Sequence, residues 1–336
     1  MRGKITNEMR NLMRAAGSSN EKQAMSAQWE LAKALELPLQ QGVFDGDIIS
    51  PFGIFEVIQL EPGAPREWSL DFVAPGTEGD YVAYTIPNHG YIPQRSVEGD
   101  YVMIPGYDVG NSIDTNLKYI RHATWQVLGR MDEALRAGFT KKLNDDGWHV
   151  LLAAGVERNI VVRDSDKAAS GQFTKRAVSL AKTVMRRNGG GNSTTVNRGK
   201  LTDLYLSPES MEDIRNWNVD QIDPVTRREI FIARENALSN IYGVNLHDLD
   251  ELGEGQEYQL FLENELSVTL PGGDVEVAVG LDQSKSDSFI TMMGPEGLEV
   301  FPDPVLHRQR RYGVYSWIQD IGFASLDGRR IILLSI

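Results

Sequence analysis

A long stripe of apolar residues at helical spacing constrains the fold of this chain more than any other feature. Between residues 117 and 143, apolar or small side chains recur at intervals of three and four, which places them on one face of an α-helix. Asp114 precedes the stripe, and its carboxylate can accept hydrogen bonds from the free amides of a helix start. We therefore expect a long helix capped by Asp114, whose apolar stripe runs to Leu143 and which is kinked at Gly147 and Trp148 before residues 150–154. A helix of this length exceeds most helices of globular proteins and would organise the fold.

The segment before this helix shows the period of two that is typical of β-strands. Trp68, Leu70 and Phe72 alternate with polar residues, and further strands are expected over 81–86 and 100–104. Residues 56–112 are therefore expected to form an extended β excursion. A ribbon of two or three strands is marginal by itself, so the excursion must find its packing partners elsewhere.

The N-terminal residues predict an arm. Residues 8–36 read as two amphipathic helical pieces separated by Gly17, Ser18, Ser19 and Asn20. This apolar stripe precedes, in the sequence, the segments that are expected to form the core. It must therefore pack against a surface that the chain reaches through an extended connection. The same chain and a neighbouring subunit remain equally open as that partner.

Several shorter elements follow the long helix. Ser207, Pro208 and Glu209 form a well-made helix start, because serine caps free amides, proline suits the first turn and glutamate suits the positive helix end. The other expected elements are a helix over 172–187, a strand over 204–206, a strand over 241–246 and a terminal strand over 331–336.

Composition excludes several classes of protein. The formal net charge is −13, which argues against a free-standing nucleic-acid binder, since such proteins neutralise phosphates with a basic face. The chain has no cysteine, so disulfides and thiolate chemistry are excluded. No export signal and no apolar run of the ~20 residues that a spanning helix needs are apparent, and we expect a soluble chain.

The motifs that usually carry enzyme chemistry are missing. The sequence holds no phosphate-binding loop, dinucleotide fingerprint, nucleophile elbow or zinc-binding helix motif, and its five histidines are scattered. The acidic loop after His247 and the run Asn144–Gly147 lack the ligand order of a calcium loop, so we interpret them as a solvated loop and a helix-interrupting turn. We predict no catalytic, cofactor or metal site, and no enzyme.

The order of these elements resembles the Hong Kong 97-type major capsid proteins of tailed bacteriophages over nearly the whole chain. The residues that carry the resemblance are Asp80–Tyr84 through Ile104–Pro105 as the E-loop, Asp114–Leu143 as the spine helix, Leu204–Pro208 leading into a P-domain helix, Ile241–Val244 as the entry to the A-domain, and Arg311–Gly313 with Gly322–Asp327 as the final P-domain strands.

The resemblance implies an α+β, Hong Kong 97-like capsid fold. Its expected parts are the N-terminal arm with its lead-in (1–55), the E-loop (56–112), the P-domain with the spine helix (113–235), the A-domain (236–309) and the C-terminal P-domain strands (310–336).

It also implies a virion protein that is assembled in the host cytoplasm. Subunits would associate as pentamers and hexamers into an icosahedral shell around double-stranded DNA, bound without sequence specificity, with scaffolding, portal and possible decoration proteins as further partners and no membrane. The expected intersubunit residues are Trp29, Trp68, Phe72, Tyr84, Tyr91, Tyr101, Arg310 and Arg311. No lysine lies between Lys33 and Lys118, so a lysine–asparagine crosslink that needs an E-loop lysine is excluded.

Two other functions remain open at this point. An encapsulin-type nanocompartment shell resembles the same fold but encloses cargo enzymes in place of a genome. An enzyme with a non-local acid–base site would require carboxylates such as Glu254 or Asp287 to converge in the folded chain.

Overall fold

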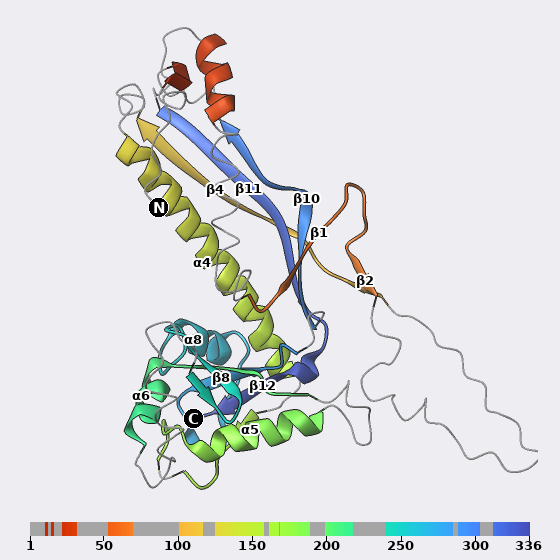
Figure 1. Cartoon of the computed structure of the whole chain (residues 1–336), viewed down its shortest axis with the longest axis vertical. Coiled ribbons are helices and arrows are strands. Elements are labelled where there is room, and N and C mark those ends of the chain that lie inside the picture. Colours follow the sequence, from red (N-terminus) through yellow and green to blue (C-terminus); the bar gives the residue numbers. More distant parts are fainter. Residues whose placement is uncertain are drawn as a thin grey trace, which may run out of the picture. The chain divides into compact units, whose positions relative to one another are not determined.

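The computed structural model describes residues 11–12, 15–16, 22–31, 53–69, 101–116, 125–157, 161–167, 169–188, 199–217, 239–284, 288–302 and 312–336 (Figure 1). The chain divides into two compact units. Unit 1 comprises 1–66, 103–147 and 290–324, and unit 2 comprises 67–102, 148–289 and 325–336. No helix within the described ranges is long and apolar enough to cross a membrane.

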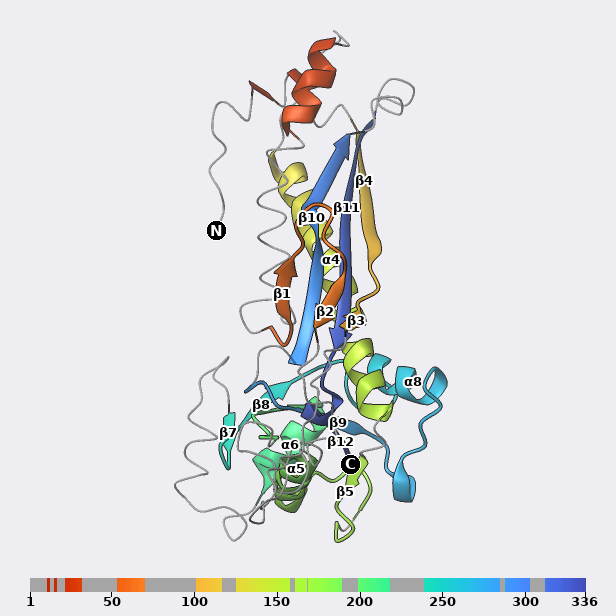
Figure 2. The same ribbon diagram turned by 90° about the vertical axis from the view of Figure 1, so that its right-hand side faces the viewer.

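Unit 1 is built on a four-stranded sheet in the order β1-β10-β11-β4. Its strands are β1 (Glu56–Gln59), β10 (Phe289–Pro302), β11 (Tyr312–Ser325) and β4 (Tyr107–Asn116). β1 runs parallel to β10, with Glu56 beside Ile290, and β4 runs antiparallel to β11, with Tyr107 beside Ile321. The long strands β10, β11 and β4 lie along the long helix α4 (Trp125–Glu157) in both views (Figures 1 and 2).

The core of unit 1 lies between this sheet and α4. Leu135, Phe139 and Leu143, spaced by four residues, are buried, as the sequence predicts for the helix stripe. Phe55 and Phe323 meet edge to face, with ring centroids 5.1 Å apart.

Two expectations about the long helix are wrong. Asp114 does not cap it, because this residue lies in β4 and pairs with Val314 of β11. The run Asn144–Gly147 does not interrupt it either, since α4 continues to Glu157. A single glycine costs a helix only about 1 kcal/mol, and the burial of Trp148 offsets that cost.

Unit 2 is built on a six-stranded sheet in the order β5-β12-β9-β6-β8-β7. β12 (Ile331–Ser335) lies between β5 (Val161–Arg163), which it parallels, and β9 (Val277–Leu281), which is antiparallel to it. β6 (Asp203–Leu206) pairs with β9 and β8 (Val244–Asp248), and β7 (Ser239–Ile241) and β5 are the two edge strands. The last residues of the chain are therefore part of the core, as expected.

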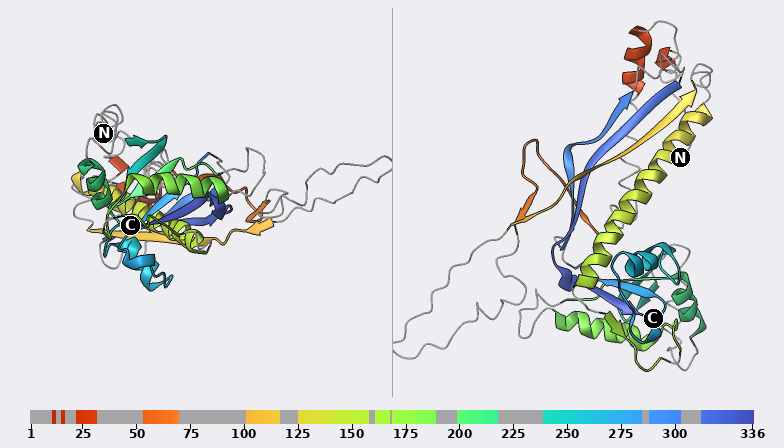
Figure 3. Two further views of the ribbon diagram at one scale, coloured as in Figure 1. Left: turned by 90° about the horizontal axis from the view of Figure 1, so that it is seen from below. Right: turned by 180° about the vertical axis from the view of Figure 1, so that it is seen from behind.

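Helices cover both faces of this sheet (Figures 1 and 3). One face carries α5 (Lys175–Asn188) and α6 (Pro208–Asn216), whose Ala177, Ala181 and Ile214 pack with strand residues such as Leu204. On the other face, Trp148 in the C-terminal third of α4 meets the ring of Tyr205 at 4.8 Å and that of Tyr258 in α8 (Glu257–Asn264) at 6.0 Å. The short helices η2 (Pro271–Gly273) and η4 (Gly328–Arg330) complete unit 2.

Most expected elements of unit 2 are confirmed. The helix over 172–187 appears as α5, the strand over 204–206 as β6, and the helix start at Ser207 as α6, where the Ser207 hydroxyl accepts from the Ser210 amide at 3.1 Å. The single strand expected over 241–246 is wrong. Tyr242 and Gly243 both have positive φ, 54° and 73°, and turn the chain between β7 and β8.

Candidate assembly surfaces

Three of the eight expected contact residues lie within the described ranges: Trp29, Trp68 and Tyr101. The other five lie outside those ranges: Phe72, Tyr84, Tyr91, Arg310 and Arg311.

Trp29 lies on an exposed stripe of the N-terminal helix at residues 22–31. Trp29 is 44% exposed and Met25, one turn earlier, is 40% exposed. The buried side of this helix holds Ala24, Ala27 and Leu31. Large apolar side chains on the outer face of a helix whose small residues face inward leave that outer face available to another surface.

Tyr101 lies on the two-stranded ribbon that β2 (Glu67–Ser69) forms with β3 (Tyr101–Met103). Tyr101 is 66% and Met103 72% exposed, and residues two apart on a strand share a face. Trp68 in β2 is half-buried. One face of β3 therefore presents two exposed apolar side chains, and the sequence prediction missed Met103 on it.

The start of this ribbon is fastened by Arg66. Its guanidinium pairs with Asp320 of β11, and its backbone oxygen accepts from the Ile104 amide at 2.9 Å. The guanidinium also occupies the space where a side chain at position 106 would project, so glycine at 106 admits it. Arg66, Ile104 and Asp320 all belong to unit 1.

Two further exposed apolar residues belong to unit 2 and were not predicted. Tyr242, at the tip of the β7–β8 turn, is 45% exposed, and Leu260 on α8 is 44% exposed. The exposure of Leu260 could have been predicted from helical spacing, because Leu260 stands on the side of α8 away from the buried Tyr258 and Leu262. The exposure of Tyr242 could not have been predicted, since it stands in a turn with positive φ, which is uncommon for a non-glycine residue.

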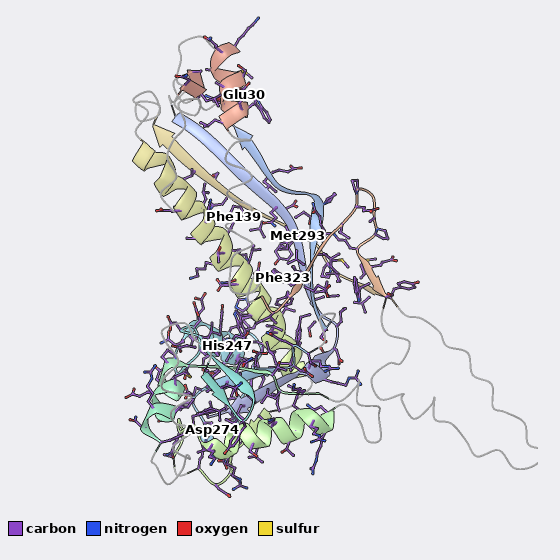
Figure 4. The ribbon with its side chains drawn as sticks, viewed as in Figure 1. Glu30, Phe139, His247, Asp274, Met293 and Phe323 are labelled. Atoms are coloured by element: carbon purple, nitrogen blue, oxygen red, sulfur yellow. The ribbon has the colours of Figure 1, made fainter. Side chains whose placement is uncertain are left out.

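The described polar clusters of unit 2 are structural in character. His247 lies 2.8 Å from the Asp203 carboxylate and stacks on the Tyr205 ring at 4.6 Å (Figure 4). Burial alone would raise the pKa of Asp203, but hydrogen bonds from His247, Thr202 and Asn245 hold that pKa below its usual value. Within the described ranges no group of three or more His, Cys, Asp or Glu side chains is placed to hold a metal ion.

Asp274 has a comparable structural role beside the last strand, β12 (Figure 4). Its buried carboxylate accepts from the Ser335 hydroxyl at 2.6 Å and pairs with Arg163 at 3.0 Å. Burial would raise the pKa of Asp274, yet hydrogen bonds from Lys167, Ser335 and Arg163 lower it. The pairing ties β5 and β12 to the η2 segment.

A cleft of about 600 Å³ opens beside the start of α5. Its buried carboxylate, Asp164, accepts from the Thr174 hydroxyl and the Asp166 amide, while Thr174 caps the first turn of α5. Asp164 and Thr174 are thus engaged in holding the helix start.

The chain is similar to known proteins in its structure and not in its sequence. No protein-family model matches the sequence, and no curated protein sequence matches it. A solved structure from Microbacterium phage Oxtober96 is similar with a TM-score of 0.54 at 10% identity, covering 84% of this chain and 89% of that one. One from Mycobacterium phage Bobi has a TM-score of 0.51 at 13% identity, covering 84% and 88%.

These two similarities extend over both units and agree with the element order derived from the sequence. The N-terminal helix, the ribbon, the long helix α4, the six-stranded sheet and the returning strands β11 and β12 occur in the expected sequence order. The chain has a Hong Kong 97-like α+β fold, which it shares with these two phage structures.

Proposed function

We propose that this chain is the major capsid protein of a tailed bacteriophage, which assembles as pentamers and hexamers into an icosahedral shell around double-stranded DNA. The observation that carries the proposal is the fold together with the ribbon β2–β3, whose Tyr101 and Met103 are largely exposed. A two-stranded ribbon is marginal in water, and a neighbouring subunit would supply the burial that it lacks.

The exposed stripe of the N-terminal helix supports the same proposal. Met25 and Trp29 add a second exposed apolar surface, and surfaces of this kind mark sites of association. In the proposed shell the arm (1–55) and the E-loop lie over neighbouring subunits. β1 and β4, near the two ends of the proposed E-loop (56–112), belong to the sheet of unit 1.

The proposed shell protein is structural and has no catalytic role. Head-to-tail contacts between copies close into rings when the rotation permits, which accounts for pentamers and hexamers from one chain. Scaffolding and portal proteins would be its partners during assembly in the host cytoplasm, and the virion its final location.

The test is sedimentation of the purified full-length protein together with negative-stain electron microscopy. We expect regular shells, or stable pentamers and hexamers. A monomer at every concentration and salt condition would refute the proposal. Shells that retain cargo enzymes and no DNA when isolated from the native host would instead identify the nanocompartment.

A further inference from the structure

Charge is strongly segregated within unit 2. Residues 167–202 contain eight Lys and Arg and no Asp or Glu, whereas residues 239–284 contain ten Asp and Glu and no Lys or Arg. The first segment includes α5 and the second includes α8. In a chain of net charge −13, every charged side chain of α5 is thus positive.

The positive side chains of α5 lie on its outer face. At 3.6 residues per turn, Lys175, Lys182, Arg186 and Arg187 fall within an arc of roughly 140°. The buried residues of α5, which include Ala177, Ala181 and Met185, occupy the opposite side. The side chains of Arg186 and Arg187 are exposed.

An exposed aromatic ring adjoins this helix face. The Lys182 ammonium donates to the backbone oxygen of Tyr242, and the Lys175 ammonium lies 5.6 Å from the centre of the Tyr242 ring. We call Lys175, Lys182, Arg186, Arg187 and Tyr242 the basic face. Its composition, an exposed aromatic ring among cations, is typical of protein interfaces.

The outer side of α8 has the complementary composition. Leu260 is 44% exposed and is flanked, three residues before and after, by the exposed Glu257 and Glu263. Glu254 and Glu265 are exposed beside them. We call Glu254, Glu257, Leu260, Glu263 and Glu265 the acidic face.

The two faces cannot neutralise each other within one chain. α5 covers one face of the six-stranded sheet through Leu204 and its neighbours, and α8 lies on the other face through Tyr258 and Trp148. With helices packed ~10 Å above and below a sheet, their outer surfaces are roughly 30 Å apart. Electrostatic interactions are screened over ~8 Å at physiological salt.

We infer that the basic face of one copy docks on the acidic face of a second copy, with Tyr242 and Leu260 at the centre of the contact. Opposite faces on opposite sides of one domain give a head-to-tail contact, which can repeat around a ring. The inference rests on the proposed function and adds to it a specific interface between neighbouring subunits of a capsomer. Nucleic-acid phosphates are the competing occupant of the basic face.

The decisive test is charge reversal of each face, alone and together, in the full-length chain. Arg186→Glu/Arg187→Glu reverses the basic face, and Glu257→Lys/Glu263→Lys reverses the acidic face. Each should lower the assembled fraction by about tenfold or more in sedimentation, since like charges then oppose each other. The variant carrying all four substitutions restores complementary charge and the wild-type net charge, and should recover assembly.

A matched control carries Glu61→Lys/Glu133→Lys, two exposed positions of unit 1, with the same change in net charge as the acidic-face variant. Thermal melts of all variants check that the subunits fold. Assembly of both reversed variants at the wild-type level would overturn the inference while leaving the shell intact. Failure of the combined variant to recover assembly would also overturn it.

Two other results separate the inference from its rivals. If Arg186→Glu/Arg187→Glu shells form normally but no longer retain duplex DNA, the basic face binds nucleic acid and the inference is wrong. If the wild-type protein itself never assembles, the proposed function fails and the interface with it.

Because the chain has no cysteine, the contact can also be probed directly. Arg186→Cys and Glu263→Cys placed in separate chains should give a crosslinked dimer with a short thiol-specific reagent only when the two variants are mixed. A mixture that crosslinks no more than either variant alone would contradict docking of these two faces.

Discussion

Glu276 illustrates how a single buried residue holds unit 2 together. Its carboxylate accepts from the Ser207 hydroxyl at 2.7 Å and the Ser210 hydroxyl at 2.9 Å, and the side chain is buried. Burial raises the pKa of Glu276 above 4.5, the neighbouring Glu209 and Asp213 add to the shift, and the two serine hydroxyls oppose it.

This pKa shift predicts the pH dependence of stability. A carboxyl whose pKa is higher in the folded chain stabilises the fold at low pH, and this contribution is lost as the pH rises from about 4.5 through the raised value. Glu276→Gln removes this loss and should flatten the stability profile above pH 4.5. Urea unfolding followed by tryptophan fluorescence measures the free energy of unfolding at each pH. Glu212→Gln, at an exposed position, is the control that should leave the profile unchanged.

The contacts of Ser207 and Arg66 show which interactions can be predicted from the sequence. The capping role of Ser207 follows from its immediate neighbours, Pro208 and Glu209, and was predicted. Its second partner, Glu276, lies 69 residues away and carries no local signal. The same limit hides Asp320 as the partner of Arg66, which is 254 residues distant.

Arg66 gives a prediction for the ribbon base. Its ion pair with Asp320 is partly exposed, so its loss should cost about 1 kcal/mol or less in overall stability. Arg66→Ala should nevertheless speed hydrogen exchange of the Ile104 amide, which bonds to the Arg66 carbonyl, because the strand then loses its anchor. Exchange over residues 101–106 that stays as slow as in an exposed-site control, Glu61→Ala, would contradict this role.

At the scale of elements, glycines show where helices and strands approach too closely for a side chain. A Cβ added at Gly280 of β9 would stand 2.6 Å from Ile332 and 2.7 Å from Leu201. Gly280→Ala should therefore destabilise unit 2 by about 1–3 kcal/mol through overpacking.

The same substitution in α4 should have the opposite effect. At Gly138 the added Cβ would meet only the end of the Asn111 side chain, at 3.0 Å. Alanine favours a helix interior by about 1 kcal/mol over glycine, so Gly138→Ala should be neutral or stabilising. Denaturant midpoints of the two variants measure the contrast, and equal shifts would argue against close packing at Gly280.

The elements that sequence analysis misplaced depend on distant pairing. β4 consists largely of polar residues, so its local pattern favoured a cap at Asp114. Its strand conformation depends on β11, with Asn116 pairing with Tyr312. By contrast, α5 and α6 carry their own apolar spacing and capping residues. α5 was predicted at nearly its observed bounds, and α6 was predicted at its observed start.

At the scale of the whole molecule, the proposed shell depends on surfaces that contribute little to one subunit. Tyr101 and Met103 are mostly exposed, so Tyr101→Ser/Met103→Ser should leave the unfolding of the dissociated subunit nearly unchanged. Each lost contact weakens association by about 25 cal/mol per Å² of apolar area no longer buried. Since each contact repeats in every subunit, we expect the shell to dissociate at a markedly lower denaturant concentration.

A substitution in the core should instead destabilise the subunit itself. Phe139 is buried in unit 1, and Phe139→Ala should destabilise the subunit itself by about 3–5 kcal/mol. Light scattering reports shell dissociation and tryptophan fluorescence reports unfolding in one titration. If Tyr101→Ser/Met103→Ser shifts the fluorescence transition as much as Phe139→Ala does, β3 packs within its own subunit, and the N-terminal helix stripe at Met25 and Trp29 becomes the surface to test for assembly.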